Sequence, residues 1–246
     1  DANGDYNLKI SKLPIDSILC LTFDDASGFD TQGFDNCIGI IEGRGLKLST
    51  FIDVQSWDGL YGGSIPDKVI NYINNGHDVG VHSFSHTDLN YYQNALILSS
   101  DAAKNVVVTV NNVGSGADWK TINKDYTTWS GSITIDSGGS EEDTLTLIQS
   151  GKFLTMEDVK NWIEAHDGWT VQVGAYLGNQ VSGRTPAICL SSGTYNVDTN
   201  TGINVDAEPY IWMQTKYAKD RLETILFEKL GYQYSVKTWG SPFHAT

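Results

Sequence analysis

The first third of the chain alternates strand-like and helix-like segments. Residues 17–23 form a continuous apolar run, which is typical of a strand buried on both faces. Residues 47–54 are rich in β-branched and aromatic side chains and predict a second strand. Pro66 opens a helix that Gly76 ends, and residues 77–82 predict a third strand. This βαβ order predicts an α/β fold with a parallel sheet and helices outside it.

A different pattern begins after about residue 92. Short strands separated by Gly, Ser and Asn are expected at 106–110, 132–135, 144–148 and 170–173. One helix interrupts them, and Thr155 and Asp158 have the spacing of its cap. Residues 138–140 and 191–204 are expected to be surface loops.

Helical periodicity returns from residue 213 and ends at Gly231, and residues 232–239 predict a further strand. We therefore expect four parts, which are a lead-in over 1–14, α/β parts over 15–92 and 211–246, and an inserted mainly-β domain over 93–210.

Potential ligands follow two of the predicted strands. Asp24 and Asp25 end the first apolar run, and His82 and His86 follow the third strand. Taken alone, an Asp-Asp pair is more typical of a turn, and two such histidines are usually structural. Together, at strand ends that meet at one edge of a parallel sheet, they favour a metal site. One carboxylate and two imidazoles leave a coordination position open for water, and the second carboxylate is free to act as a base. The pattern indicates metal-assisted hydrolysis.

The charge of the chain excludes some partners. A formal net charge of −14 over 246 residues disfavours nucleic acid and anionic membrane surfaces, because both attract clustered Lys and Arg. No apolar stretch approaches the length of a membrane span. The acidic balance suits a neutral or cationic partner, or serves solubility alone.

The same motifs resemble those of the NodB-type polysaccharide deacetylases, carbohydrate esterase family 4. Residues 22–25 (Thr-Phe-Asp-Asp) are similar to the first family motif, and residues 82–86 (His-Ser-Phe-Ser-His) to the second. Residues 49–52 and 76–80 fit the stretch between them. Residues 239–243 (Trp-Gly-Ser-Pro-Phe) resemble a degenerate third motif. The resemblance covers roughly 15–92 and 213–246.

This resemblance implies a partial or distorted (β/α) barrel and a role for each matching residue. Asp25, His82 and His86 would bind one divalent metal ion, for which we expect zinc, with cobalt, nickel and manganese as alternatives. Asp24 would be the catalytic base, and the backbone N–H of Phe243 would stabilise the oxyanion. The substrate would be an N- or O-acetylated glycan outside the cell or at its surface, or on a virion.

Three aromatic residues are further candidates for the sugar groove. They are Trp57, Tyr61 and Trp239, of which the first two follow a strand end.

The chain also departs from the family pattern. Ala26 replaces the usual Gly, Gly240 stands where many members have Arg, and His244 replaces another Gly. No fourth or fifth motif, and hence no general-acid histidine, can be found. The chain also begins without Met, which indicates a processed or excised piece. Either the polypeptide continues, or another chain completes the barrel, or activity has been lost. The alternative function is a degenerate module for glycan binding or for structural and assembly contacts with a protein partner.

Overall fold

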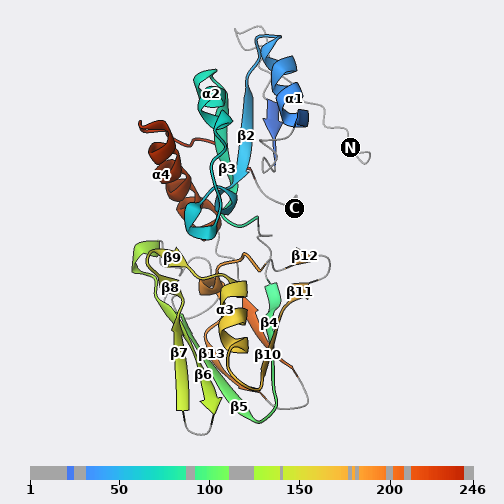
Figure 1. Ribbon diagram of the computed structural model, residues 1–246, viewed down its shortest axis with the longest axis vertical. Coiled ribbons are helices and arrows are strands. Elements are labelled where there is room, and N and C mark those ends of the chain that lie inside the picture. The colour runs from blue at the N-terminus through green and yellow to red at the C-terminus, as the bar shows by residue number, and fades with distance from the viewer. Residues whose placement is uncertain are drawn as a thin grey trace, which may run out of the picture.

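The computed structural model describes most of the chain and divides it visibly into two halves (Figure 1). An α/β half contains both ends of the described chain, and a β-rich segment, residues 92–207, forms the other half. The lead-in, Asp25 and Phe243 lie outside the described residues, which are 21–24, 32–86, 92–110, 125–138, 141–176, 179–180, 183–197, 202–207 and 212–240.

A parallel sheet forms the centre of the α/β half, as the sequence predicted. Its strands are β1 (Leu21–Phe23), β2 (Leu48–Asp53) and β3 (Asp78–Ser83), in the order β1-β2-β3. Thr50 of β2 pairs with Phe23 on one side and Val79 on the other. The carboxyl ends of the three strands therefore lie at the same edge of the sheet.

Helices accompany these strands. They are α1 (Gln32–Glu42), α2 (Lys68–Asn74) and α4 (Ala218–Leu230). The predicted end of α4 is confirmed, because Gly231 adopts the left-handed conformation with φ 75° that favours glycine. The sequence analysis did not predict α1, in which glycines at positions 33 and 39 weaken the helical signal.

The predicted strand over 232–239 is reduced to a short bridge beside β3. Val81 and Trp239 are parallel bridge partners, with Val81 N–H donating to Thr238 O and Gly240 N–H donating to Val81 O. Because only this bridge forms, residues 232–239 do not make a regular strand. The bridge extends the sheet in sequence order, and the part of the chain that is described forms no closed barrel.

The β-rich segment consists of antiparallel strands and one helix. One sheet has the order β10-β4-β14 and the other the order β13-β5-β6-β7. The strands of these sheets are β4 (Tyr92–Ser100), β5 (Lys104–Val110), β6 (Gly131–Gly138), β7 (Glu141–Thr146), β10 (Trp169–Val173), β13 (Gly193–Val197) and β14 (Ile203–Ala207). Two hairpins add β8 (Ile148–Gln149) with β9 (Lys152–Phe153), and β11 (Ala175–Tyr176) with β12 (Asn179–Gln180).

The prediction of a surface loop over residues 191–204 is wrong. It contains β13 and the start of β14, whose residues pair with β5 and β4. Asn, Gly and Thr in this stretch predict turns, but pairing with long strands on both sheets overrides that local preference. Gly138, also expected in a loop, ends β6.

The predicted cap of the inserted helix is confirmed. Helix α3 (Met156–Glu164) begins after Thr155, whose hydroxyl accepts from the Asp158 N–H while the Asp158 carboxylate accepts from the Thr155 N–H. This reciprocal pair satisfies two of the N–H groups that a helix start leaves open.

Contacts of the loop after β2 join the two halves. The Tyr61 hydroxyl both donates to Phe153 O and accepts from Phe153 N–H. Asp58, which is fully buried, accepts two hydrogen bonds from the Arg221 guanidinium of α4 at 2.5 and 2.7 Å. This two-pronged geometry is the favourable one for a buried arginine–carboxylate pair. It fixes the loop between the sheet and the β-rich segment.

The approach of residues 238–240 to the sheet depends on a glycine. A Cβ at Gly80 would lie 2.3 Å from Thr238 Oγ1 and 2.8 Å from Phe51 Cδ1. We expect Gly80→Ala to destabilise the fold by about 1–3 kcal/mol, because the added methyl overpacks a closed interface. Denaturant unfolding monitored by tryptophan fluorescence measures this change.

Gly39→Ala is the matched control. Gly39 lies in α1 and has open space where a Cβ would stand, so this variant should be stabilised by about 0.5–1 kcal/mol. Equal stability of Gly80→Ala and the wild type would contradict the close packing.

Candidate functional site

The candidate site lies at the carboxyl edge of the parallel sheet. Asp24 directly follows β1 and is exposed, His82 lies in β3, and His86 is four residues further on. The imidazole centroids of His82 and His86 are 5.2 Å apart. The predicted ligand Asp25 and the predicted oxyanion donor Phe243 lie outside the described residues. The structure thus brings the two histidines together and leaves the full ligand set a prediction.

His82 is buried and has a defined tautomer. Its Nδ1 lies 3.1 Å from the carbonyl oxygen of Gly240, which can only accept a hydrogen bond. Nδ1 therefore carries the proton, and Nε2 is the ring nitrogen that can act as a metal ligand. A metal-binding histidine is usually oriented by such a bond from its other ring nitrogen.

A tight turn separates the two histidines. Ser83 and His86 have φ values of 123° and 52°, in the region that non-glycine residues rarely adopt. The Ser83 hydroxyl accepts a hydrogen bond from His86 N–H at 2.8 Å. Such conformations persist only where surrounding contacts enforce them, and they are concentrated at functional sites.

Gln214 supplies the enforcing contacts. It belongs to a π-helical turn, Met213–Tyr217, that leads into α4, and it is fully buried. Its Oε1 accepts from the N–H groups of Phe84 and Ser85 at 2.9 and 3.2 Å, and its Nε2 donates to Ser85 Oγ. A side chain from the far end of the sequence therefore holds the backbone between the two candidate ligands.

The residues present fit a metal site in part. Two neighbouring imidazoles, one with a fixed tautomer, are suitable nitrogen donors for zinc and similar ions. Within the described ranges no group of three or more His, Cys, Asp or Glu side chains is arranged to hold a metal ion. The third ligand predicted from the sequence, Asp25, falls outside those ranges.

A carboxylate that the sequence analysis did not single out lies beside the histidines. Asp53 is the last residue of β2, is buried, and pairs with Ser83 after a shift in the strand register at Ile52. Burial raises the pKa of Asp53, although the charges of Arg184 and His86 and the hydrogen bond from Ser56 oppose this rise. The signal in the sequence was available, because Asp53 ends a predicted strand just as Asp24 follows one.

The β-rich segment contributes an arginine to this edge. Nη1 of Arg184 lies 2.7 Å from Asp53 Oδ2, and Nη2 donates to Ser56 Oγ at 3.2 Å. The Asp53 carboxylate is thus fixed by a residue from the other half of the molecule. Arg184 could not be predicted from the sequence, because no motif surrounds it and its partner Asp53 is distant in the chain.

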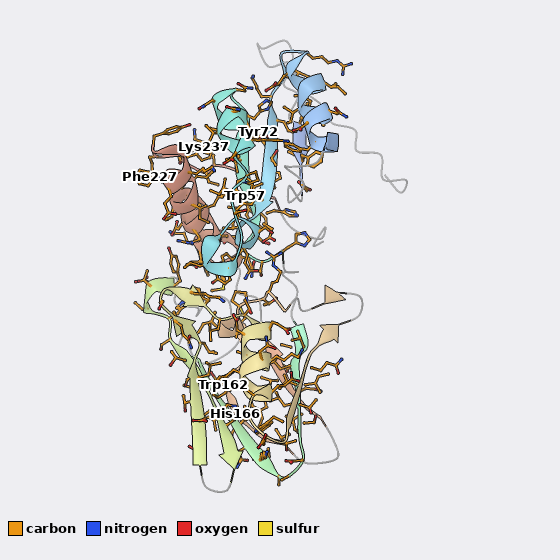
Figure 2. The ribbon with its side chains drawn as sticks, viewed as in Figure 1. Trp57, Tyr72, Trp162, His166, Phe227 and Lys237 are labelled. Atoms are coloured by element: carbon orange, nitrogen blue, oxygen red, sulfur yellow. The ribbon has the colours of Figure 1, made fainter. Side chains whose placement is uncertain are left out.

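Two of the three aromatic candidates, Trp57 and Tyr61, lie in the loop after β2. Trp57 is 3 % exposed and packs in the core of the α/β half (Figure 2). The prediction followed from its place after a strand end, but the next residue, Asp58, is drawn inward by Arg221. Tyr61 is half-buried, and its hydroxyl is engaged by the Phe153 backbone.

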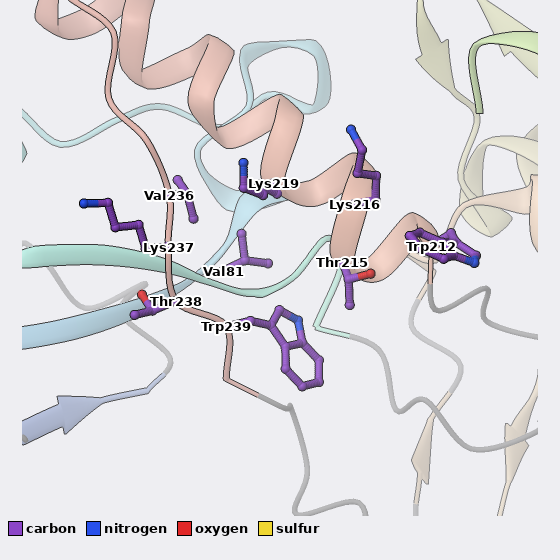
Figure 3. A pocket seen from close by; sticks show the side chains of 9 residues that line it. All are labelled: Val81, Trp212, Thr215, Lys216, Lys219, Val236, Lys237, Thr238 and Trp239. Atoms are coloured by element: carbon purple, nitrogen blue, oxygen red, sulfur yellow. The ribbon is translucent and has the colours of Figure 1, made fainter. Parts of the chain in front are cut away.

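Trp239 is 43 % exposed but lies on the opposite face of the sheet from His82. It is the bridge partner of Val81, and side chains alternate between faces along a strand. Trp239 and Val81 both line a recess of about 250 Å³ between the sheet and the helices (Figure 3). The position of Trp239 in the family motif did not reveal this orientation.

Two other histidines have structural partners. His77, which the sequence analysis expected to be structural, is buried with Nδ1 accepting from Leu48 N–H and Nε2 beside Glu42. His166, expected at the surface, lies in the β-rich half and pairs with Asp143 (Figure 2).

Comparison with known proteins assigns the first part of the chain. Residues 13–117 match the family model of polysaccharide deacetylase. Over this region the chain is similar to the polysaccharide deacetylase family. The match includes Asp24, His82 and His86, and it extends into the first strands of the β-rich segment. No curated protein and no solved structure matches the chain. None of the helices in the described ranges is long and apolar enough to cross a membrane.

Substituting Gln214 tests how the histidine turn is held. Gln214→Leu keeps the side-chain volume similar but leaves the N–H groups of Phe84 and Ser85 without their acceptor. We expect a loss of about 1–3 kcal/mol of stability for each unsatisfied group. Denaturant unfolding measures this loss.

Gln233→Leu is the control, because Gln233 is exposed and the chemical change is the same. Surface substitutions of this kind usually change stability by less than about 0.5 kcal/mol. Equal effects of the two substitutions would mean that the Gln214 amide does not support the turn.

Proposed function

We propose that the protein is a metal-dependent hydrolase that removes acetyl groups from an N- or O-acetylated glycan outside the cell or at its surface. The observation that carries the proposal is the proximity of His82 and His86 at the same carboxyl edge of the sheet as Asp24, inside the region that matches the deacetylase family model. Asp25, His82 and His86 would hold the ion, and zinc is the metal that we propose.

In the proposed site the metal would activate water and the substrate carbonyl, and the protein would orient the metal ligands. A bound divalent ion lowers the pKa of water and polarises a carbonyl oxygen. His82 would present Nε2 to it, because its Nδ1 proton is engaged by the Gly240 carbonyl. The Gln214 contacts would keep the His86 turn from rearranging when a ligand arrives. Such preorganisation favours catalysis, since no reorganisation is needed during the reaction.

Asp24 would be the proton acceptor. It is exposed directly after β1, so a bound glycan and a water molecule can reach it. In the proposed reaction Asp24 takes the proton of the attacking water as it adds to the acetyl carbonyl, and the Phe243 N–H stabilises the oxyanion. Collapse of the adduct breaks the C–N or C–O bond, and the proton taken by Asp24 passes to the leaving nitrogen or oxygen, so that acetate and a free amine or hydroxyl on the sugar result.

Asp24→Asn separates the base from the metal site. The variant should keep one bound zinc per chain and lose at least about 100-fold in acetate release, the usual contribution of a general base. His82→Ala should lose the metal and the activity together. Metal content is measured by atomic emission, and acetate release from an acetylated oligosaccharide is measured enzymatically.

Asp35→Asn is the control, because Asp35 is an exposed carboxylate of α1 that pairs with Lys68 and has no proposed role in the site. It should retain both metal and activity. A wild-type protein that is loaded with metal and releases no acetate would overturn the proposal.

A further inference from the structure

A short 3₁₀ turn after β2, Val54–Ser56, contacts the backbone between the two candidate histidines. The N–H of Gln55 donates a hydrogen bond to Phe84 O at 2.8 Å. The N–H of the same Phe84 donates to Gln214 Oε1 at 2.9 Å. Both backbone polar groups of this residue are therefore bound, one by the turn after β2 and the other by the π-helical turn that leads into α4.

Arg184 of the β-rich segment makes three polar contacts with this part of the chain. Its Nη1 lies 2.7 Å from Asp53 Oδ2, and its Nη2 donates to Ser56 Oγ at 3.2 Å. Its carbonyl oxygen accepts from Gln55 Nε2 at 3.0 Å. Ser56 Oγ also donates to Asp53 Oδ2 at 2.7 Å. One residue thus contacts the 3₁₀ turn at its middle and its end, together with the residue that precedes it.

The Asp53–Arg184 pair differs from an ordinary surface ion pair. The side chain of Asp53 is 8 % exposed, whereas that of Arg184 is 45 % exposed. An exposed pair contributes little to stability, but a buried carboxylate needs a compensating charge. Burial raises the pKa of Asp53, and the positive charge of Arg184 opposes this rise. The ionised Asp53 carboxylate therefore depends on the position of Arg184.

The turn between the histidines depends on its neighbours because its backbone is strained. The φ values of 123° at Ser83 and 52° at His86 persist only where surrounding contacts enforce them. The 3₁₀ turn binds the Phe84 carbonyl, and Asp53 pairs with Ser83. A change in the 3₁₀ turn is therefore transmitted to the backbone that presents His86.

We infer that Arg184 is a positioning residue for the metal site. It orders the Val54–Ser56 turn, and that turn holds the Phe84 carbonyl, so that the two candidate ligands are presented in a fixed geometry. The β-rich segment thus contributes to metal binding without supplying any of the proposed ligands. The inference rests on the proposed function for the metal ion, whereas the ordering of the backbone can also be measured without metal.

Zinc affinity and hydrogen exchange test this role in Arg184→Met. Removing a residue that orients a metal ligand usually lowers metal affinity about 10- to 100-fold. Because Arg184 acts through one further contact, we expect a loss of about 10-fold, measured by competition with a chromogenic chelator. In the protein without metal, the amides of residues 54–56 and 83–86 should exchange faster, since exchange reports local opening.

The absorption spectrum of bound cobalt separates positioning from stability. A variant that is only less stable gives the wild-type d–d absorption once it is folded and loaded with Co²⁺. Displaced ligands change the energy and the intensity of that absorption. We expect a changed spectrum for Arg184→Met at saturating cobalt.

Arg184→Lys is measured beside it, because Arg184→Met leaves the buried Asp53 carboxylate without its cation and is strongly destabilising. Lysine keeps a positive charge there but cannot bind Asp53 and Ser56 together through a planar guanidinium. This variant should stay folded and lose about 3-fold in zinc affinity, less than the full effect of losing an orienting residue. The same two stretches should exchange faster.

Lys152→Met is the matched control. Lys152 is also a cation of the β-rich segment beside the loop after β2, where it lies over the Tyr61 ring and pairs with Asp158. Its substitution leaves the contacts of Arg184 intact. Zinc affinity, cobalt spectrum and exchange at residues 54–56 and 83–86 should therefore match the wild type.

Wild-type zinc affinity, cobalt spectrum and exchange in both Arg184 variants would overturn the positioning role, as would equal effects in Lys152→Met. Failure of the proposed function is distinguishable. A wild type that binds no zinc overturns both conclusions. A wild type whose zinc affinity depends on Arg184 but that releases no acetate supports the positioning role and refutes the deacetylase.

Discussion

The buried amide of Gln214 accepts a hydrogen bond from Phe84 N–H, 130 residues earlier in the chain. The candidate site depends on this long-range contact. The Oε1 atom of Gln214 binds the backbone of the turn between His82 and His86. Without this acceptor, two buried N–H groups would lose their hydrogen bonds, and the turn with two rare backbone conformations would lose contacts that help to enforce it. The fold of the β-rich segment must therefore bring Gln214 back to this turn. The Asp58–Arg221 ion pair fixes α4, the helix that follows Gln214, against the loop after β2. The two candidate histidines are close in sequence, but the side chain that holds their turn comes from a distant part of the chain.

Features that depend on neighbouring residues could be predicted from the sequence. The three parallel strands follow from apolar runs and their spacing, and the α3 cap follows from Thr155 and Asp158. The end of α4 follows from Gly231. In each case the determining interaction lies within one turn or one strand. The clustering of His82 and His86 at a strand end was predictable for the same reason.

Features that depend on tertiary pairing could not be predicted. Residues 191–204 have a turn-like composition, but β13 and β14 are completed by hydrogen bonds to β5 and β4. Trp57 follows a strand end, yet the buried ion pair of its neighbour Asp58 turns the loop inward. Trp239 lies in a motif-like stretch, but its bridge to Val81 places it on the opposite face from His82. Single-sequence patterns do not encode which distant partner decides an orientation.

The family match covers the proposed catalytic base and metal ligands but not all of the residues that support them. The matched region, residues 13–117, contains the proposed base Asp24, the proposed metal ligands Asp25, His82 and His86, and Asp53. It ends before both Arg184 and Gln214, which reach the strand edge from elsewhere in the chain. Arg184, which the β-rich segment contributes, fixes the Asp53 carboxylate at the end of β2. The proposed chemistry therefore lies at strand ends within the matched region, whereas two of the side chains that support this edge come from outside it.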